Sequence, residues 1–417
     1  MNAARPAMNG ARRLLWLVLP LSLLSGCGPA PEELRGTAYL AISVEGDQPL
    51  TKAILQEEVL QAQAIVAAFR QLHPRVAIET NLLRESAFLE EVRRRQAAGL
   101  GPDLMLVAGS TAHALVEADL ARGLELPQAA RRQVDTDSLQ RLAIPPRGLA
   151  GLPILRRPQL ACFNRTRLAS SPASTDALLR EARGGVRVGL AVESRSLFWS
   201  TGPLGADRAI IAAAAGRPLA AGEREGLQRW LAWLSAANFN QKVFIEPDQE
   251  ALVQGLLERR LDWIPCNSGS LSRLRGSLGN ALGVSDLPAG PYGPPTPITR
   301  LRVLAFGRDS TARQRNVAEA LAVFALNPWI QSTLTSDNQD MLPTNRFVPP
   351  SALHTPVLKA MQRSVRQADA SDAISRLLPA GDPRDRALSR LVTAVAFGEI
   401  TATEATGAVV QALDPRP

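Results

Sequence analysis

TAYLAISV at residues 37–44 and DLMLV at residues 103–107 are short apolar runs with the length and composition of buried β-strands. The residues between and after these runs predict, in chain order, a helix over 51–72, a strand over 76–80, a helix over 86–98 and a helix over 110–120. Strand and helix therefore alternate from the first apolar run onward. This alternation predicts a sheet with substantial parallel content and helices on both faces.

The same pattern continues along the chain. Further strands are predicted over 152–154, 159–163, 186–192, 261–266 and 301–306. Further helices are predicted from Ser174 or Thr175 to Ala182, and over 207–215, 223–237, 247–259, 311–326, 356–368, 382–396 and 401–413. Residues 288–297 are rich in Pro and Gly and predict a loop through which the chain returns to its first half. We expect an α/β fold with two lobes, because a chain of this length exceeds what one core usually organises.

The N-terminal residues predict a lipoprotein signal. Leu24-Ser25-Gly26-Cys27 closes an apolar run that follows Arg12 and Arg13, and that run is too short for a membrane-spanning helix. Cleavage before Cys27 would leave this cysteine as a lipidated N-terminus, and residues 27–36 would form a tether. An ordinary secretory signal with a coincidental cysteine is the alternative. Both interpretations place the remaining chain outside the cytoplasm, anchored by lipid in the first case.

Charge and composition exclude some partners and cofactors. Residues 1–26 contain three arginines and no acid, so their removal lowers the formal charge from +8 to +5. The arginines lie on helix faces such as Arg93-Arg94-Arg95, without aromatic residues between them, so no nucleic acid partner is expected. The chain has three His and no metal-like spacing of His and Cys, so neither a metal nor another cofactor is expected.

Cys162 and Cys266 are the cysteines that remain after Cys27. Each follows an apolar stretch, which favours two separate buried thiols over a disulfide, although an oxidising compartment permits the bridge. No catalytic residue is nominated, because Gly-x-Ser-x-Gly does not occur and Glu246 and Asp248 lie at a helix start, where acids suit the helix dipole. Carboxylates paired from distant segments are invisible in a sequence, so a secreted glycosidase or lyase is an alternative.

A series of short motifs carries a resemblance to a known family. In chain order they are Ala67-Ala68-Phe69 to Val76, Gly101-Pro102-Asp103-Leu104, Gly151-Leu152-Pro153, Phe163-Asn164-Arg165, Ser174-Thr175-Asp176-Ala177-Leu178 and Leu342-Pro343-Thr344-Asn345. Their order and spacing resemble those of maltose-type, family 1 extracellular solute-binding proteins, which serve ABC importers. The sequence departs from that family at Phe163, where a Tyr is usual, and in holding only two Tyr residues.

The resemblance implies two α/β lobes of the periplasmic-binding-protein type II fold, each a mixed sheet flanked by helices. We expect residues 37–157 and 305–335 in the first lobe, and 158–304 and 336–417 in the second. The ligand is expected between the lobes, the closed form is expected to bind ABC permease subunits, and the protein is expected to be a monomer. A binding lipoprotein that signals to a membrane sensor is a further alternative to transport.

Candidate ligand-binding residues follow from the expected strands, because ligands of open α/β sheets bind at the carboxyl ends of the strands. Glu45 follows the first strand, Ser110 and Thr111 follow 103–107 at a helix start, and Asn267 and Ser268 follow 261–266. Ser110 has the alternative role of a helix N-cap, and Asn267 and Ser268 that of a turn. Arg300 precedes the last expected strand and suits a carboxylate or phosphate, with a surface arginine as the alternative.

Flat aromatic rings are the other requirement for a sugar or polyol ligand. The candidates are Trp199, Trp263, Trp329 and Tyr292, together with Phe163, which resembles the hinge-side aromatic of the family. Trp263 and Phe163 lie within expected strands, where core packing is the alternative. Trp230 and Trp233 have helical spacing and are expected in the core.

Overall fold

The computed structural model describes residues 33–44, 52–348, 354–378 and 382–416, and Leu34–Pro417 forms one compact unit. The predicted signal peptide and the lipidation site Cys27 lie outside the described residues. None of the helices in these ranges is both long and apolar enough to span a bilayer.

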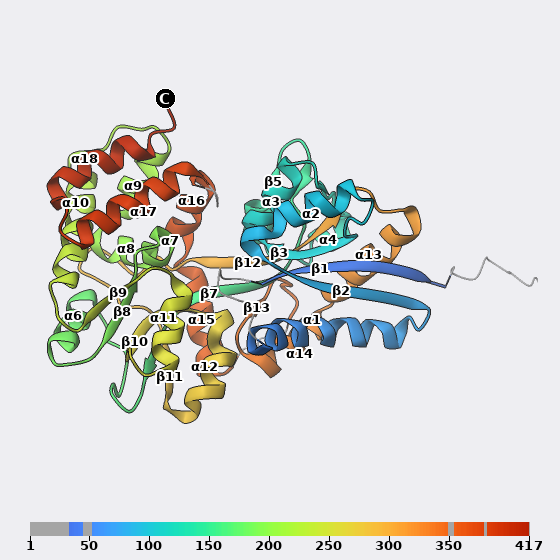
Figure 1. Cartoon of the computed structure of the whole chain (residues 1–417), viewed down its shortest axis with the longest axis horizontal. Coiled ribbons are helices and arrows are strands. Elements are labelled where there is room, and N and C mark those ends of the chain that lie inside the picture. The colour runs from blue at the N-terminus through green and yellow to red at the C-terminus, as the bar shows by residue number, and fades with distance from the viewer. Residues whose placement is uncertain (1–32, 45–51, 349–353, 379–381, 417) are drawn as a thin grey trace, which may run out of the picture. The chain divides into compact units, whose positions relative to one another are not determined.

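The first half of the fold is a parallel sheet covered on both faces. Strands β1 (Gly36–Val44), β2 (Val76–Arg84) and β3 (Leu104–Ala108) lie in the order β2-β1-β3, all parallel. Helices α1 (Lys52–Leu72) and α14 (Pro328–Asn338) lie on one face, and α2 (Phe88–Ala97) and α3 (Gly109–Glu117) lie on the other (Figure 1). Strand β12 (Thr299–Gly307) completes this sheet by pairing antiparallel with β3. The alternation predicted from the sequence is therefore present.

Strand β7 (Leu152–Asn164) joins the two halves. Two strands were predicted here, over 152–154 and 159–163, because Arg156, Arg157 and Pro158 interrupt the apolar pattern. The structure instead holds one continuous strand of 13 residues, whose middle is buried against β12. Its first part pairs with β12 and its second part pairs with β10 (Trp263–Asn267).

The second half repeats the parallel arrangement. Strands β10, β8 (Val188–Ala191) and β9 (Val243–Glu246) are mutually parallel, and β11 (Leu282–Ser285) pairs with β7. The α-helices of this half are α6 (Thr175–Arg183), α7 (Ser194–Leu197), α8 (Thr201–Leu204), α9 (Asp207–Ala214), α10 (Ala221–Asn238), α11 (Gln249–Leu257), α12 (Leu271–Leu278), α15 (Pro356–Arg366), α16 (Asp369–Leu377), α17 (Pro383–Ala396) and α18 (Ala402–Leu413). Helices α7, α8, α12 and α16 and strands β9 and β11 were not predicted.

Three clusters of buried apolar side chains form the core. One cluster is built from residues between Ala38 and Leu155 and between Leu301 and Met341. The other two are built from residues between Leu160 and Leu413. Each half therefore has a core of its own, and helix α13 (Ala312–Ala325), which follows β12, packs in the first.

The two remaining cysteines form a disulfide, Cys162–Cys266, with a Cα–Cα distance of 5.7 Å. The expectation of two separate thiols is wrong, although both sulfurs are buried as predicted. The pairing of strands β7 and β10 explains the disulfide. Ile264 lies opposite Cys162 in this ladder, so Cys266, two residues further along β10, is the diagonal neighbour of Cys162.

Candidate functional site

Strand direction brings the carboxyl ends of both parallel sets to the boundary between the halves. Strand β12 is antiparallel to both β3 and β7, so β3 runs in the same sense as β7, toward the second half. Strand β10 is antiparallel to β7 and runs toward the first half. The carboxyl end of β3 pairs with Arg302 of β12, which in turn pairs with Leu155 of β7. The carboxyl end of β10 pairs with Gln159 of β7. These points are roughly 13 Å apart along β7.

In the first half, polar side chains gather at this edge around the buried Arg302, which is 1% exposed. Its guanidinium donates to Ser43 Oγ at 2.9 Å and to the Ser43 carbonyl at 2.8 Å, at the end of β1. The Glu85 carboxylate, just after β2, lies 4.0 Å away. Thr111 donates a hydrogen bond to Glu85. One cation therefore lies at the ends of β1 and β2, and Glu85 connects it to the start of α3.

Two predicted residues lie at this start of α3. The structure places Thr111 beside Glu85, and Ser110 next to it at the edge of the sheet. The N-cap of α3 is Ala108, so the alternative role of Ser110 as the N-cap is wrong. Glu45 lies outside the described residues.

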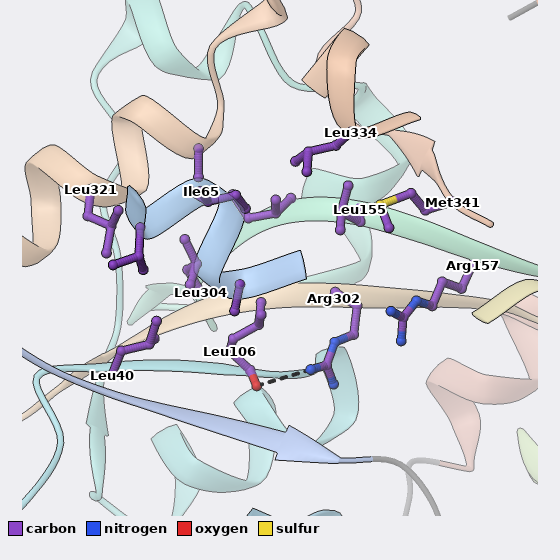
Figure 2. A pocket seen from close by; sticks show the side chains of 14 residues that line it. Leu40, Ile65, Leu106, Leu155, Arg157, Arg302, Leu304, Leu321, Leu334 and Met341 are labelled. Carbon is purple, nitrogen blue, oxygen red and sulfur yellow. Dashed lines mark hydrogen bonds between the residues drawn. The ribbon is translucent and has the colours of Figure 1, made fainter. Parts of the chain in front are cut away.

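Arg302 also borders a small cavity in the first core. Its volume is about 40 Å³, room for little more than water, and its lining is apolar except for Arg157 and Arg302. Both arginines lie at one end of the cavity, away from Leu40 and Leu321, and Arg302 donates from there to the Leu106 carbonyl (Figure 2). The cavity is a void beneath α1 and α13, and the two arginines mark where the core meets the boundary between the halves.

In the second half, Asn267 and Ser268 begin the turn after β10. Asn267 Oδ1 accepts from the Gly269 N–H at 2.9 Å, so it forms the turn that was its alternative role. Ser268 is fully buried and donates to the Asp340 carbonyl at 2.6 Å. A Cβ at Gly269 would lie 3.0 Å from Arg157 Cδ, so the glycine allows the Arg157 side chain to lie against this turn.

A larger cavity lies at the carboxyl ends of β8 and β9. Its volume is about 550 Å³, which is in the range of small-molecule sites. It is lined by Val192 and Glu193 after β8, Pro247 after β9, and residues on or just after α17, namely Ser389, Arg390, Thr393, Ala394 and Glu399. Acidic, basic and hydroxyl side chains therefore line a space that is large enough for a small solute.

Hydrogen bonds connect the residues that line this cavity to strand β7. Gln159 of β7 donates to the Ser196 carbonyl at 3.0 Å, and Ser196 Oγ donates to Glu193 Oε2 at 2.8 Å. Ser194 donates to Asp385 Oδ1 at 2.6 Å, and Arg195 donates to Asp385 Oδ2 at 2.9 Å. These bonds hold the loop after β8 between β7 and α17 and orient the Glu193 side chain.

Three of the predicted aromatic residues are buried in the second core. Trp199 is fully buried and packs edge-on against Trp233 and Trp263, with ring centroids 6.1 and 5.9 Å apart. Trp263 is fully buried and donates to Ser171 Oγ at 2.9 Å, and Phe163 lies opposite it on β7. In this conformation none of these rings offers a face to a ligand.

The other two aromatic candidates are exposed. Tyr292, 55% exposed, carries the Arg229 guanidinium 3.8 Å above its ring centroid. Trp329, 70% exposed, lies in the first turn of α14. Neither borders the cavity of about 550 Å³. Trp230 and Trp233 are buried in the core as predicted.

An ion pair connects the two halves beside the start of β12. Arg141, at the end of α5 (Thr136–Arg141), lies 3.3 Å from the Asp372 carboxylate on α16, and also donates to the Thr299 carbonyl. Burial raises the pKa of Asp372 to about 7, against the opposing effect of Arg141. Within the described ranges, no three His, Cys, Asp or Glu side chains gather as a metal site.

The sequence matches no protein-family model and no curated protein. The structure is similar to several solved proteins. The GacH receptor of Streptomyces glaucescens, solved free and with acarbose, matches with a TM-score of 0.71 and 14% identity, over 91% of this chain and 98% of that one. An ABC transporter solute-binding protein from Thermotoga lettingae, bound with α-D-tagatose, matches with a TM-score of 0.69 and 14% identity, over 91% and 98%.

The maltodextrin-binding protein MalE1 from L. casei BL23 matches with a TM-score of 0.67 and 15% identity, over 91% of this chain and 99% of that one. The chain therefore has the two-lobed type II fold of periplasmic binding proteins, with mixed sheets flanked by helices. This confirms the predicted fold class and, at the level of the fold, the resemblance to maltose-type solute-binding proteins.

The sequence analysis missed the polar residues that line the two cavities. Arg157 and Arg302 stand inside apolar strands, which is a signal of function or of strand pairing that the sequence does show. Glu193, Ser389 and Arg390 have no such signal, because helix α17 is brought to the end of β8 only by tertiary packing.

Proposed function

We propose that this chain is an extracytoplasmic solute-binding protein that captures a small polyhydroxylated solute, a carbohydrate or polyol, and delivers it to an ABC import permease. The observation that carries the proposal is the convergence of polar carboxyl ends from both halves on strands β7 and β12. The fold adds support, because the solved proteins that share it include one in complex with acarbose and one bound with α-D-tagatose.

The proposed mechanism is a shift between open and closed conformations. A solute that contacts residues of both halves favours the closed state by its differential affinity, and β7 and β12 absorb the motion. The lobes proposed for this motion are residues 37–157 with 305–335, and 158–304 with 336–417. The first core also contains Leu301, Val303, Leu304 and Met341, so these residues pack with the first lobe. The protein needs no catalytic group for this task.

Calorimetric titration of the purified protein tests the proposal. The panel contains neutral sugars, polyols, amino acids and phosphate esters, and heat with a sugar, a sugar derivative or a polyol supports the proposal. Heat with amino acids alone would discard the carbohydrate assignment. Glu193→Gln should weaken binding about tenfold or more, because a cavity-lining acceptor loses its charge. Glu258→Gln is the matched control, since that side chain is 57% exposed after α11.

Membrane attachment through Cys27 is also part of the proposal. The motif Leu24-Ser25-Gly26-Cys27 supports it. Metabolic labelling with a tritiated fatty acid should mark the wild-type protein, and Cys27→Ser should abolish the label and release the protein from the membrane. A variant that stays labelled would contradict lipidation at this residue.

A further inference from the structure

Three arginines lie on one face of the paired strands β7 and β12. Arg157 of β7 is directly opposite Arg300 of β12 in the antiparallel ladder, so their side chains point to the same face. Arg302 is two residues further along β12 and shares the face of Arg300. The cavity lining agrees, because both Arg157 and Arg302 border the same void (Figure 2). Two largely apolar strands therefore bring three guanidinium groups together on one face.

This cluster lies where the carboxyl ends of the two parallel sets meet. Arg302 contacts the end of β1 through Ser43, and Arg157 packs against the turn that begins at Asn267, after β10. Arg157 and Arg302 are 3% and 1% exposed, whereas Arg300 is only partly buried. Two of the arginines are thus fixed within the fold, and Arg300 is the member that a solute can reach first.

The three side chains differ in the role that their contacts allow. Arg302 donates to a hydroxyl and to two carbonyl oxygens, so its guanidinium is held in one orientation. Glu85 lies 4.0 Å from Arg302 and offsets part of its charge, and the guanidinium groups of Arg157 and Arg300 add two further positive charges to this face. Arginine forks match the paired oxygens of carboxylates and phosphates, and burial strengthens such charge-assisted bonds.

We propose that the solute carries an anionic group, a carboxylate or a phosphate, that binds at the Arg157–Arg300–Arg302 face. The inference rests on the proposed function and narrows its ligand class from neutral sugars to sugar acids or sugar phosphates. Arg300 and Arg157 bind the anionic group, and Arg302 acts as a positioning residue. The hydroxyl groups of the solute are left to polar side chains of the second half.

Matched sets of ligands test the inference. Each set contains a neutral sugar, its uronate and its 6-phosphate, beginning with glucose, glucuronate and glucose 6-phosphate, and titrations with inorganic phosphate accompany them. We expect one anionic member to bind at least tenfold more tightly than its neutral partner, and added salt to reduce that preference. The uronate and phosphate arms identify which anionic group is preferred.

The other outcomes separate this inference from the proposed function. Equal or tighter binding of the neutral sugars overturns the inference and leaves the proposed function standing. Failure of every sugar and derivative to bind overturns both. Binding of inorganic phosphate as tightly as the sugar phosphate also overturns the inference, because it shows a simple ion site without solute recognition.

Variants of the cluster add a readout that a purely structural role would not move. Arg300→Gln should lower affinity for the anionic ligand at least tenfold and change affinity for its neutral partner less than twofold. Arg300→Lys should restore part of the preference. Arg308→Gln is the control, because Arg308 is 51% exposed at the far end of β12 and pairs with Asp119. Arg157→Gln, checked for a native melting curve, provides a second test, and full anionic preference in both folded variants overturns the inference.

Discussion

At the scale of single residues, the buried indoles show how packing decides the role of an aromatic ring. Trp199 follows the loop after β8, a position typical of a ligand platform, yet its ring is enclosed by Trp233 and Trp263. Its neighbours come from α10 and β10, which are distant in sequence. A sequence pattern along one segment contains no information on such an enclosure.

Truncation of this ring should therefore affect stability. We expect Trp199→Ala to lower the free energy of unfolding by about 3–5 kcal/mol, because it leaves a large cavity in a packed core. Trp329→Ala is the control, with an expected change within about 0.5 kcal/mol, since its side chain is 70% exposed. Urea denaturation measures both. A Trp199→Ala variant as stable as the wild type, but unable to bind solute, would assign the ring to the ligand instead.

Asp372 should give the protein a specific dependence on pH. Burial raises its pKa to about 7 in the folded chain, whereas an unfolded Asp has a pKa of about 4, so the folded state binds the proton more tightly. Its stabilising contribution is full below about pH 4 and is lost as the pH rises to about 7. The charged groups that act on it are Arg141, Asp137, Arg376 and Asp369.

The variant Asp372→Asn isolates this contribution from those of other carboxyl groups. As the pH rises from about 4 to about 7, the free energy of unfolding of the wild type should fall relative to that of the variant, by up to about 4 kcal/mol. Denaturant titrations at several pH values measure the difference between the two slopes. Parallel curves over this range would show that Asp372 titrates normally.

At the scale of elements, local sequence signals predicted the helices more successfully than they predicted the pairing of the strands. Ser174 is the N-cap of α6, and its side chain accepts from the Ala177 N–H at 3.1 Å. Asp248 is the N-cap of α11, and its side chain accepts from the Ala251 N–H at 2.8 Å. Such caps depend on residues three positions apart and are visible in the sequence. Helix α16 was missed because its nine residues include few large apolar side chains and two Asp residues, a residue type that is more common at helix caps than in helix interiors.

Strand β7 shows why the candidate site was harder to predict than the fold. Arg156-Arg157-Pro158 suggests a break, and only the pairing with β12, more than a hundred residues away, makes this segment a buried strand. The positions that follow predicted strands, such as Thr111 and Asn267, could be nominated from the sequence. Arg157 and Arg302 stand out as arginines inside apolar strands, but their neighbours are set by long-range pairing, and Glu193 has no signal because its neighbours depend on the docking of α17.

The disulfide joins β7 to β10 directly behind the turn at Asn267. It closes a loop with a sequence separation of 104 residues, so its removal should destabilise the protein by about 2–5 kcal/mol through the added freedom of the unfolded chain. The double variant Cys162→Ala with Cys266→Ala, measured by thermal denaturation beside the wild type, tests this. An unchanged melting temperature would contradict a stabilising role for the bridge.

At the scale of the whole molecule, the packing of each half and the strand β7 that joins them define how the protein can move. Each core is packed within itself, whereas β7 pairs with β12 of the first half and with β10 and β11 of the second. The Arg141–Asp372 pair adds a contact between the halves beside Thr299, where β12 begins. A motion that bends the paired strands β7 and β12 leaves both cores intact, which makes rigid-body closure the favoured response to a ligand.

Closure makes a prediction about the shape of the molecule in solution. A solute that binds both halves should reduce the radius of gyration measured by small-angle X-ray scattering, because it favours the closed conformation. Glu193→Gln should need more ligand for the change but reach the same final profile at saturation, since the variant alters affinity and leaves the strands that bend unchanged. Calorimetric binding of a solute with identical scattering profiles before and after saturation would contradict closure and indicate a rigid site, in which affinity arises without movement of the halves.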